Sequence, residues 1–283
     1  MIKRLGIVGS GIMGSGIAEV AAKAGIEVLL RSRKQETADA MVTALTKSLD
    51  KQVEKGKLDA GERDQVLSRV TGTHDLHALT DCDLVIESVV EDLGVKKDLF
   101  KQLDLVVKDE AILATNTSTL PVVDLAVVTE RPERVCGIHF FNPAPMMSLV
   151  EIVRPLTASD ETISAARGFA EACGKGPVEV KDRAGFIVNA LLFPYLNNAV
   201  RMLETGTASG EDIDAAMRGG CNFPMGPLAL LDLVGLDTSL SILDALYDEF
   251  RDSNYAAVPT LRRMVAAGHL GRKSGQGFYD YRK

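Results

Sequence analysis

The chain has 283 residues, of which 46% are hydrophobic and 25% are charged, and it contains no tryptophan. This length suits one large domain or two modest ones, and the ordinary composition argues against an intrinsically disordered protein. The formal net charge of −7 and the pI near 5.3 provide no attraction for polyanions, so DNA binding is not expected.

Short runs rich in Val, Ile and Leu alternate with helical patterns over the first two-thirds of the chain. The runs typical of strands are KRLGIVG, EVLLR, RVTGT, CDLVIES, AILATN, RVCGIHF, LVEIVR and PVEV. Helical periodicity lies between them, in MGSGIAEVAAKAG, VKKDLFKQLDLVV and ETISAARGFAEACG. This order predicts an α/β fold, with a doubly wound, mostly parallel sheet of the Rossmann type covered on both faces.

A glycine-rich loop, VGSGIMGSG, follows the first predicted strand and opens the first predicted helix. In the G-x-G-x-x-G spacing, Gly9 allows a tight turn, Gly11 lets the backbone approach a pyrophosphate, and Gly14 lets helix and strand pack closely. The N-terminus of the helix then binds the anion. We therefore predict dinucleotide binding by residues of this loop, namely Gly9, Ser10, Gly11, Ile12, Met13 and Gly14.

The second predicted strand ends in EVLLRSRK. An NAD-binding domain usually has an acidic residue there, whose carboxylate binds the ribose 2′-hydroxyl. This chain has Ser32 between Arg31 and Arg33 instead, and a hydroxyl flanked by guanidinium groups suits a 2′-phosphate. We therefore predict a preference for NADP over NAD. The alternative is that both arginines are only solvated residues at a strand end.

Residues 36–68 exceed an ordinary crossover and are typical of two charged helices, joined near GKLDAG and inserted on the surface. Further along, CGIHFFNPAPMMSLVEIV contains one histidine and one glutamate among mostly apolar residues. His139 and Glu151 lie at equal distances from Pro145, in two predicted strands, so a reversal of the chain at Pro145 would place them opposite each other. His139 would then lie near the edge of the sheet where ligands bind.

A carboxylate bound to one imidazole nitrogen fixes the tautomer and stabilises the imidazolium, so that the other nitrogen can exchange a proton with a substrate. Oxidation of a secondary alcohol by hydride transfer to a nicotinamide requires such a proton acceptor. We therefore predict that His139 and Glu151 form a catalytic pair. The alternative is a buried pair that only joins two strands.

Strand patterns stop near KDRAG, and helical patterns follow in FIVNALLFPYLNNAVRMLETG, SGEDIDAAMRGG, GPLALLDLVGLDTSLSILDALYDEF and VPTLRRMVAAG. We predict a Rossmann domain over residues 1–183 and a helical substrate and dimerisation domain over residues 184–283, with a helix beginning at Ser209. Roughly 100 helical residues make a marginal domain, so we expect a homodimer through it.

Cys82, Cys136, Cys173 and Cys221 are widely spaced and form no CxxC pair, which indicates reduced core thiols and no metal site. The N-terminus lacks the successive regions of a secretion signal. The most apolar stretch, AGFIVNALLFPYLNNAV, is interrupted by Asn and Pro and does not reach the ~20 apolar residues that cross a bilayer. We expect a cytoplasmic protein that binds neither membranes nor nucleic acid.

Motifs spread over the whole chain carry a resemblance to a known family. They are GSGIMGSGIAEV, VIESVVED, NTSTL, HFFNPAP, LVEIVRP, DRAGFIVNALLFPYLNNAVRMLE, FPMGPLALLDLVGLD and GRKSGQGFYDY. Together they resemble the L-3-hydroxyacyl-CoA dehydrogenase family, particularly its short-chain 3-hydroxybutyryl-CoA members. The resemblance implies a two-domain dimer with the active site between the domains, with His139 as the base and Glu151 as its partner.

The resemblance also assigns further residues to the site. It implies that Ser118 and Asn189 bind the substrate oxygen and that Asn142 belongs to the substrate site. It implies that Glu91 and Lys96 contact the cofactor and that Asn116 lies beside nicotinamide and substrate. The residues alone leave other roles open: Ser118 as a cap of the helix after Pro121, Asn189 as a packed polar group, and the Glu91 and Lys96 pair as part of a solvated helix face.

We therefore expect reversible NAD(P)-dependent oxidation of (S)-3-hydroxybutyryl-CoA, or of a short relative, to the 3-oxoacyl-CoA, in butanoate or fatty acid metabolism. The phosphates of coenzyme A would bind lysines of the inserted helices, among Lys47, Lys51, Lys55 and Lys57, with Lys51 and Lys55 as the main candidates. A solvated charged face is the alternative for these lysines. Two other functions remain open: a dehydrogenase of 3-hydroxyacyl groups on an acyl carrier protein, and a non-catalytic nucleotide-binding protein similar to lens crystallins.

Overall fold

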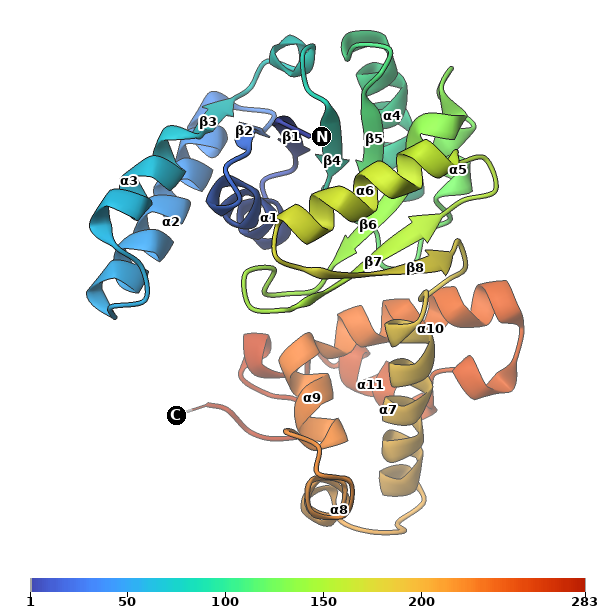
Figure 1. The fold of residues 1–283 in the computed structure, drawn as a ribbon. Helices are drawn as coiled ribbons and strands as arrows, with labels where there is room; N and C mark the ends of the chain where they lie inside the picture. Colours follow the sequence, from blue (N-terminus) through green and yellow to red (C-terminus); the bar gives the residue numbers. More distant parts are fainter. Residues whose placement is uncertain (1, 283) are drawn as a thin grey trace. The chain divides into compact units, whose positions relative to one another are not determined.

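The computed structural model describes residues 2–282, and the chain forms two compact units that divide between Asp182 and Arg183. The first unit contains an eight-stranded sheet in the order β3-β2-β1-β4-β5-β6-β7-β8 (Figure 1). Its strands are β1 (Arg4–Val8), β2 (Glu27–Arg31), β3 (Val70–Thr73), β4 (Leu84–Glu87), β5 (Ile112–Thr115), β6 (Val135–Phe140), β7 (Leu149–Arg154) and β8 (Gly176–Lys181). Its helices are α1 (Ile12–Lys23), α2 (Gln35–Glu54), α3 (Ala60–Ser68), α4 (Leu93–Val106), α5 (Val123–Ala126) and α6 (Asp160–Ala172).

Neighbouring strands of the sheet are parallel except for β6 and β7, which are antiparallel. This confirms the predicted Rossmann-type sheet and the reversal of the chain between the two strands. The register places His139 opposite Glu151, as the symmetry of the sequence about Pro145 predicts. The last strand differs from the expectation of a sheet covered on both faces, because β8 lies at the sheet edge and most of its residues are exposed.

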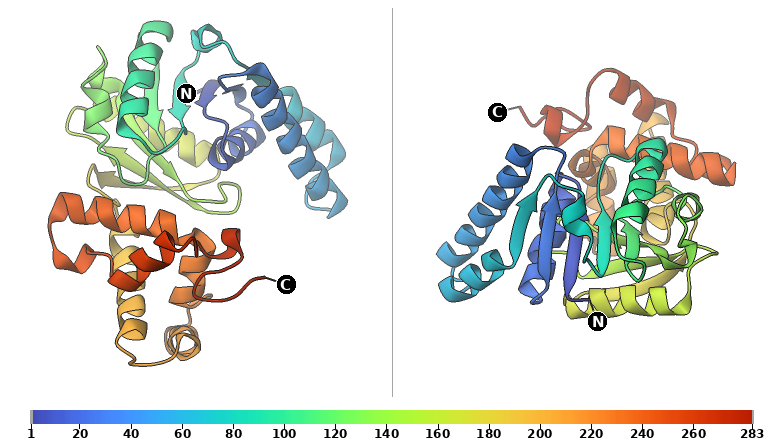
Figure 2. Two further views of the ribbon diagram at one scale, coloured as in Figure 1. Left: turned by 180° about the vertical axis from the view of Figure 1, so that it is seen from behind. Right: turned by 90° about the horizontal axis from the view of Figure 1, so that it is seen from above.

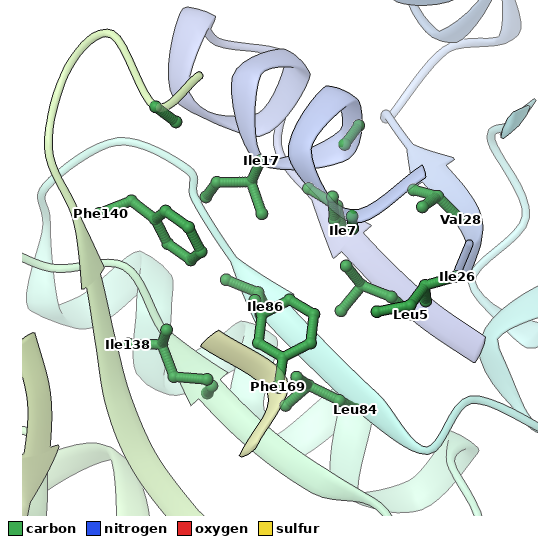
Figure 3. Packing of buried hydrophobic residues seen from close by; sticks show 14 of the residues in the cluster. Leu5, Ile7, Ile17, Ile26, Val28, Leu84, Ile86, Ile138, Phe140 and Phe169 are labelled. Carbon is green, nitrogen blue, oxygen red and sulfur yellow. The ribbon is translucent and has the colours of Figure 1, made fainter. Parts of the chain in front are cut away.

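Alternate residues of the strands face a single hydrophobic cluster on one side of the sheet. Leu5 and Ile7 of β1 belong to this cluster, together with Ile17 of α1 and Phe169 of α6 (Figure 3). The other face is covered by α4 and α5, which contact β5 and β6. In Figure 1, α6 lies in front of the sheet, whereas the view from behind shows α4 in front of it (Figure 2).

The inserted segment forms the two predicted helices, α2 and α3, which pack against each other. Its expected place on the surface is only partly right. The side chains of Met41, Leu45 and Leu49 are buried and belong to the hydrophobic cluster of the sheet. The amphipathic pattern of α2 therefore adds a layer to the core, while its lysines stay on the outer side.

The second unit consists of helices around a core of its own. They are α7 (Val188–Glu204), α8 (Gly210–Cys221), α9 (Pro227–Val234), α10 (Leu236–Phe250) and α11 (Pro259–Ala266). Ser209 accepts a hydrogen bond from the amide of Asp212, which confirms the predicted helix start. The stretch GPLALLDLVGLD is broken at Gly235, whose φ of +102° ends α9 and begins α10 in a conformation that favours glycine.

Buried carboxylates hold the C-terminal segment of this unit. Asp232 accepts hydrogen bonds from the amides of Phe278 and Tyr279, at 2.9 Å each, and its pKa is raised, chiefly by burial. A Cβ atom at Gly277 would lie 1.9 Å from Oδ1 of Asp232, which explains the second glycine in GQGFYDY. Among residues 2–282, no helix combines the length and the apolar character that a membrane crossing requires.

Candidate active site

The glycine loop follows β1 and has the shape that a dinucleotide needs. A Cβ atom at Gly9 would lie 2.2 Å from the carbonyl oxygen of Ser88, and one at Gly14 would lie 2.6 Å from the carbonyl oxygen of Gly9. The space above Gly11 is open, with no atom within 4 Å of a Cβ placed there. Close packing below the loop and open space above it fit a pyrophosphate lying against the backbone at the start of α1.

A cavity of about 690 Å³ lies beside this loop. It brings together residues from the C-terminal ends of β1, β2 and β4 and one side of α4. Its lining includes Gly9, Ser10, Gly11, Arg31, Ser32, Arg33, Val90, Val95, Asp98 and Leu99. The glycine loop and the segment Arg31–Ser32–Arg33 thus line the same cavity, whose volume is in the range of small-molecule binding sites.

Two guanidinium groups lie near each other in this cavity. The pKa of Arg31 is lowered, first by burial and second by the charge of Arg33. Arg31 is half-buried and Ser32 is 6% exposed, whereas Arg33 is exposed. The alternative of a solvated strand end therefore fits Arg33 but not Arg31. The two positive charges repel each other, and a bound anion would offset this repulsion.

His139 and Glu151 form a buried pair across β6 and β7. The distance from Nδ1 of His139 to Oε2 of Glu151 is 2.7 Å, and the two residues are 3% and 0% exposed. An ionised carboxylate only accepts hydrogen bonds, so Nδ1 carries the proton and Nε2 is the basic nitrogen of the neutral ring. The predicted contact between the two residues is confirmed.

Ser118 lies on the other side of the imidazole ring. Its Oγ is 3.1 Å from Nε2 of His139, so the loop after β5 and the strands β6 and β7 together contribute a Ser–His–Glu chain near the C-terminal ends of β5 and β6. The alternative role of Ser118 as a helix cap is wrong, because the amides of Val122 and Val123 donate to Asp182 instead.

Glu91 and Lys96 lie next to the Ser118 loop. Glu91 accepts a hydrogen bond from the amide of Ser118 at 2.9 Å, and Nζ of Lys96 is 3.3 Å from its other carboxylate oxygen. Lys96 is fully buried and also bonds Glu87 at 2.7 Å. A solvated helix face is therefore the wrong description of Lys96, whereas the side chain of Glu91 is 40% exposed.

The two asparagines that we predict for the site in this unit, Asn116 and Asn142, have different environments. Asn116 accepts a hydrogen bond from the amide of Phe140 at 2.9 Å and so joins the ends of β5 and β6. Asn142 is exposed and lines a second cavity of about 470 Å³, together with Ser10, Gly11 and Ser48. Lys51 and Lys55 are exposed and stand outside the lining of this cavity.

Asn189 belongs to the second unit, where it is the second residue of α7 and is 8% exposed. Its predicted role toward the substrate oxygen stays a prediction.

Two family models together match almost the whole chain. Residues 4–183 match the NAD binding domain of 3-hydroxyacyl-CoA dehydrogenase, and residues 185–281 match its C-terminal domain. The chain belongs to the 3-hydroxyacyl-CoA dehydrogenase family.

Full-length relatives support this membership in the 3-hydroxyacyl-CoA dehydrogenase family. The chain is 50% identical over 286 residues to a 3-hydroxybutyryl-CoA dehydrogenase of Mycobacterium tuberculosis, covering 99% of each chain. It is 47% identical over 280 residues to one of Clostridioides difficile, covering 99% of this chain and 100% of the relative. The crystal structure of (S)-3-hydroxybutyryl-CoA dehydrogenase PaaH1 from Ralstonia eutropha superposes with a TM-score of 0.97 at 42% identity, covering 100% of each chain.

Membership in the 3-hydroxyacyl-CoA dehydrogenase family makes the first unit an NAD(P)-binding domain.

Three residues near the Ser118 loop are absent from the sequence-based predictions, namely Glu87, Thr115 and Thr117. Glu87 was detectable, because it is a carboxylate within the apolar run DLVIES, and the same signal had singled out Glu151. Thr115 and Thr117 give no such signal, because threonine is common in strands and turns.

Proposed function

We propose that the protein catalyses the reversible, NAD(P)-dependent oxidation of (S)-3-hydroxybutyryl-CoA, or of a short relative, to the 3-oxoacyl-CoA. The observation that carries this proposal is the hydrogen-bonded chain Ser118–His139–Glu151. This chain lies in the same sheet as the glycine loop that follows β1. The names of the full-length relatives support the same reaction.

His139 is the proposed acid and base. Its Nε2 accepts the proton of the substrate hydroxyl during oxidation, and the imidazolium returns it during reduction. Glu151 holds the proton on Nδ1 and stabilises the positive ring from a buried position. Ser118 donates a hydrogen bond to the same substrate oxygen, and Asn189 does so from the second unit. A bound nicotinamide would accept the hydride that leaves C3 of the acyl chain during oxidation.

An assay of acetoacetyl-CoA reduction tests this proposal. The wild type should consume the reduced cofactor, followed by absorbance at 340 nm. His139→Ala should lower kcat by about 10²- to 10⁴-fold, because the proton donor is lost, while the Kd of the cofactor stays unchanged. Retention of wild-type kcat in His139→Ala would refute the assignment. Reduction of only the acyl carrier protein form would favour the alternative substrate.

For the cofactor we propose NADP, with NAD as the weaker substrate. The support is the arrangement of Ser32 and two arginines in the nucleotide cavity, with no carboxylate at the Ser32 position. The comparison of kcat/KM for NADP and NAD tests it, with Ser32→Asp as the matched variant. The wild type should prefer NADP and Ser32→Asp should prefer NAD, because a carboxylate repels the 2′-phosphate. A wild-type preference for NAD above about tenfold would contradict this choice.

Glu91 and Asn116 are proposed to lie beside the nicotinamide. Lys96 would affect the cofactor through its ion pair with Glu91. The cavity lined by Asn142 and Ser48 is proposed to receive part of the acyl-CoA, whose phosphates would reach Lys51 and Lys55 on the outer side of α2. A Lys47/Lys51/Lys55→Glu triple variant should raise KM for the acyl-CoA with little change in kcat. An unchanged KM would exclude these lysines.

We also infer a homodimer formed through the second unit, and residence in the cytoplasm. The support for a dimer is a set of exposed apolar side chains on this unit, which includes Leu191, Met202, Phe223 and Leu233. The support for the cytoplasm is that all four cysteines are free. Cys82 and Cys136 are core thiols as predicted, whereas Cys173 is partly exposed and Cys221 is exposed. Burial raises the pKa of Cys82 to about 11 and that of Cys136 to about 12, and such thiols remain protonated and inert.

A further inference from the structure

A chain of charged side chains runs from the interior of the sheet to the loop that carries Ser118. Glu87, the last residue of β4, accepts hydrogen bonds from Nζ of Lys96 at 2.7 Å, from Oγ1 of Thr115 at 2.9 Å and from the amide of Val89 at 2.6 Å. Lys96 continues the chain to Glu91 at 3.3 Å. Residues 87–96 and Thr115, which lie in two separate stretches of the sequence, therefore meet behind one loop.

The inner part of this chain is closed to solvent. Glu87 and Lys96 are both 0% exposed, so each charge depends on its partner for stabilisation. The ammonium of Lys96 is directed at two carboxylates and has no exposed surface. Its influence on any ligand must therefore pass through Glu91, whose side chain is 40% exposed.

The outer part of the chain holds the Ser118 backbone. Oε1 of Glu91 accepts from the amide of Ser118 at 2.9 Å and from the hydroxyl of Thr117. Thr117 in turn accepts from the amide of Leu120 at 2.9 Å. The main chain of Ser118 is thus fixed on one side by Glu91, while its Oγ contacts His139 on the other side.

We propose that Glu91 is a positioning residue that fixes Ser118 against His139, and that Lys96 and Glu87 hold Glu91 in place for this purpose. This inference rests on the proposed function, because it assigns Ser118 to the reaction. The buried network acts as a rigid support, and rigid placement of a reacting group within a fraction of an ångström has a large effect on rate.

Kinetics of Glu91→Ala at saturating substrate and cofactor test the proposal. The truncated side chain is partly exposed, so the fold should persist, while the loop loses its anchor. We expect kcat to fall by about 10- to 100-fold. Glu91→Gln keeps an oxygen acceptor and should lose less. Lys97→Met serves as the matched control, because it removes the neighbour of Lys96 on α4 and breaks a partly exposed ion pair with Asp124 of α5, and it should keep the wild-type kcat. A loss confined to the Kd of the cofactor would overturn the proposal.

A double-mutant cycle with Ser118→Ala separates positioning from an independent contribution. If Glu91 acts through Ser118, adding Glu91→Ala to Ser118→Ala should change kcat by no more than about twofold. Effects that multiply in the double variant would show that Glu91 contributes by another route, and would also overturn the proposal.

Hydrogen exchange of the cofactor-free protein provides a measurement that does not depend on activity. A peptide that covers Thr117–Leu120 should exchange faster in Glu91→Ala than in the wild type, whereas a peptide from β6 should not change. Equal exchange in the 117–120 peptide would refute the anchoring of Ser118. An inactive wild type with the expected exchange difference would refute the proposed function alone.

Discussion

At the scale of residues, the orientation of one imidazole ring decides the chemistry. Nδ1 of His139 faces the buried Glu151 and Nε2 faces Ser118, so the two nitrogens have different neighbours and different roles. A neutral ring with its proton on Nδ1 is ready to accept a second proton at Nε2. Burial makes the arrangement specific, because a buried histidine and carboxylate keep their orientation through each other.

Glu151→Gln tests this orientation. The amide can donate to Nδ1 and so favours the wrong tautomer, and it can no longer stabilise the imidazolium. We expect kcat to fall by about 10²- to 10⁴-fold, with the cofactor Kd unchanged. Glu179→Gln on β8 is the control, because it alters an exposed ion pair with Arg154 in the same sheet. A kcat in Glu151→Gln similar to that of the control would contradict the role of Glu151.

At the scale of elements, the close approach of β6 and β7 places the pair in register. A Cβ atom at Gly137 would lie 2.7 Å from Cβ of Val153 on the opposite strand, so only glycine allows this spacing, two residue pairs before His139 and Glu151. Elsewhere, Asp83 joins the start of β1 to the segment after α4. It accepts from the amides of Lys3 and Arg4 and from Nζ of Lys108, the last at 2.6 Å.

The pH dependence of stability follows from Asp83. Burial by itself would raise the pKa of this carboxyl, but its hydrogen bonds from Lys108 and from two backbone amides outweigh burial and hold the pKa below 3.8. Its ionised form is therefore stabilised in the folded state, so its contribution is present above pH 3.8 and is lost as the pH falls through the lower folded value. Urea unfolding should show Asp83→Asn destabilised near pH 6 and closer to the wild type near pH 3. A constant difference across this range would contradict the linkage.

At the scale of the whole molecule, the proposed homodimer would bury apolar side chains that are exposed on the second unit. Leu191 is 72% exposed and Leu233 is 50% exposed, and large apolar side chains of this kind are buried when they belong to an interaction surface. The helices of this unit provide a core for only about 100 residues, which gains from further burial.

Sedimentation should give a mass of about twice the 30.4 kDa of one chain. Leu191→Glu combined with Leu233→Glu should shift the protein toward the monomer, because charges cannot be buried unpaired at an interface. Leu105→Glu, at a site 86% exposed on the first unit, should leave the mass unchanged. A wild type that sediments as a monomer would exclude the dimer.

The sequence by itself determined the order of strands and helices, the glycine loop and the pairing of His139 with Glu151. Each of these depends on short-range rules, namely alternation, turn chemistry and symmetry about one reversal of the chain. Antiparallel neighbours joined by a short loop are close in sequence, so their register can be inferred. The family motifs added Ser118, Glu91 and Lys96 as candidates.

Only the tertiary structure decided how the remaining charges are used. Glu87 and Thr115 belong to neighbouring parallel strands, β4 and β5, with a whole crossover helix between them in the sequence. Their contact depends on strand order and on burial, which local patterns do not contain. For the same reason Lys96, which is polar and lies on a helix, shows its role only once the fold has enclosed it between two carboxylates.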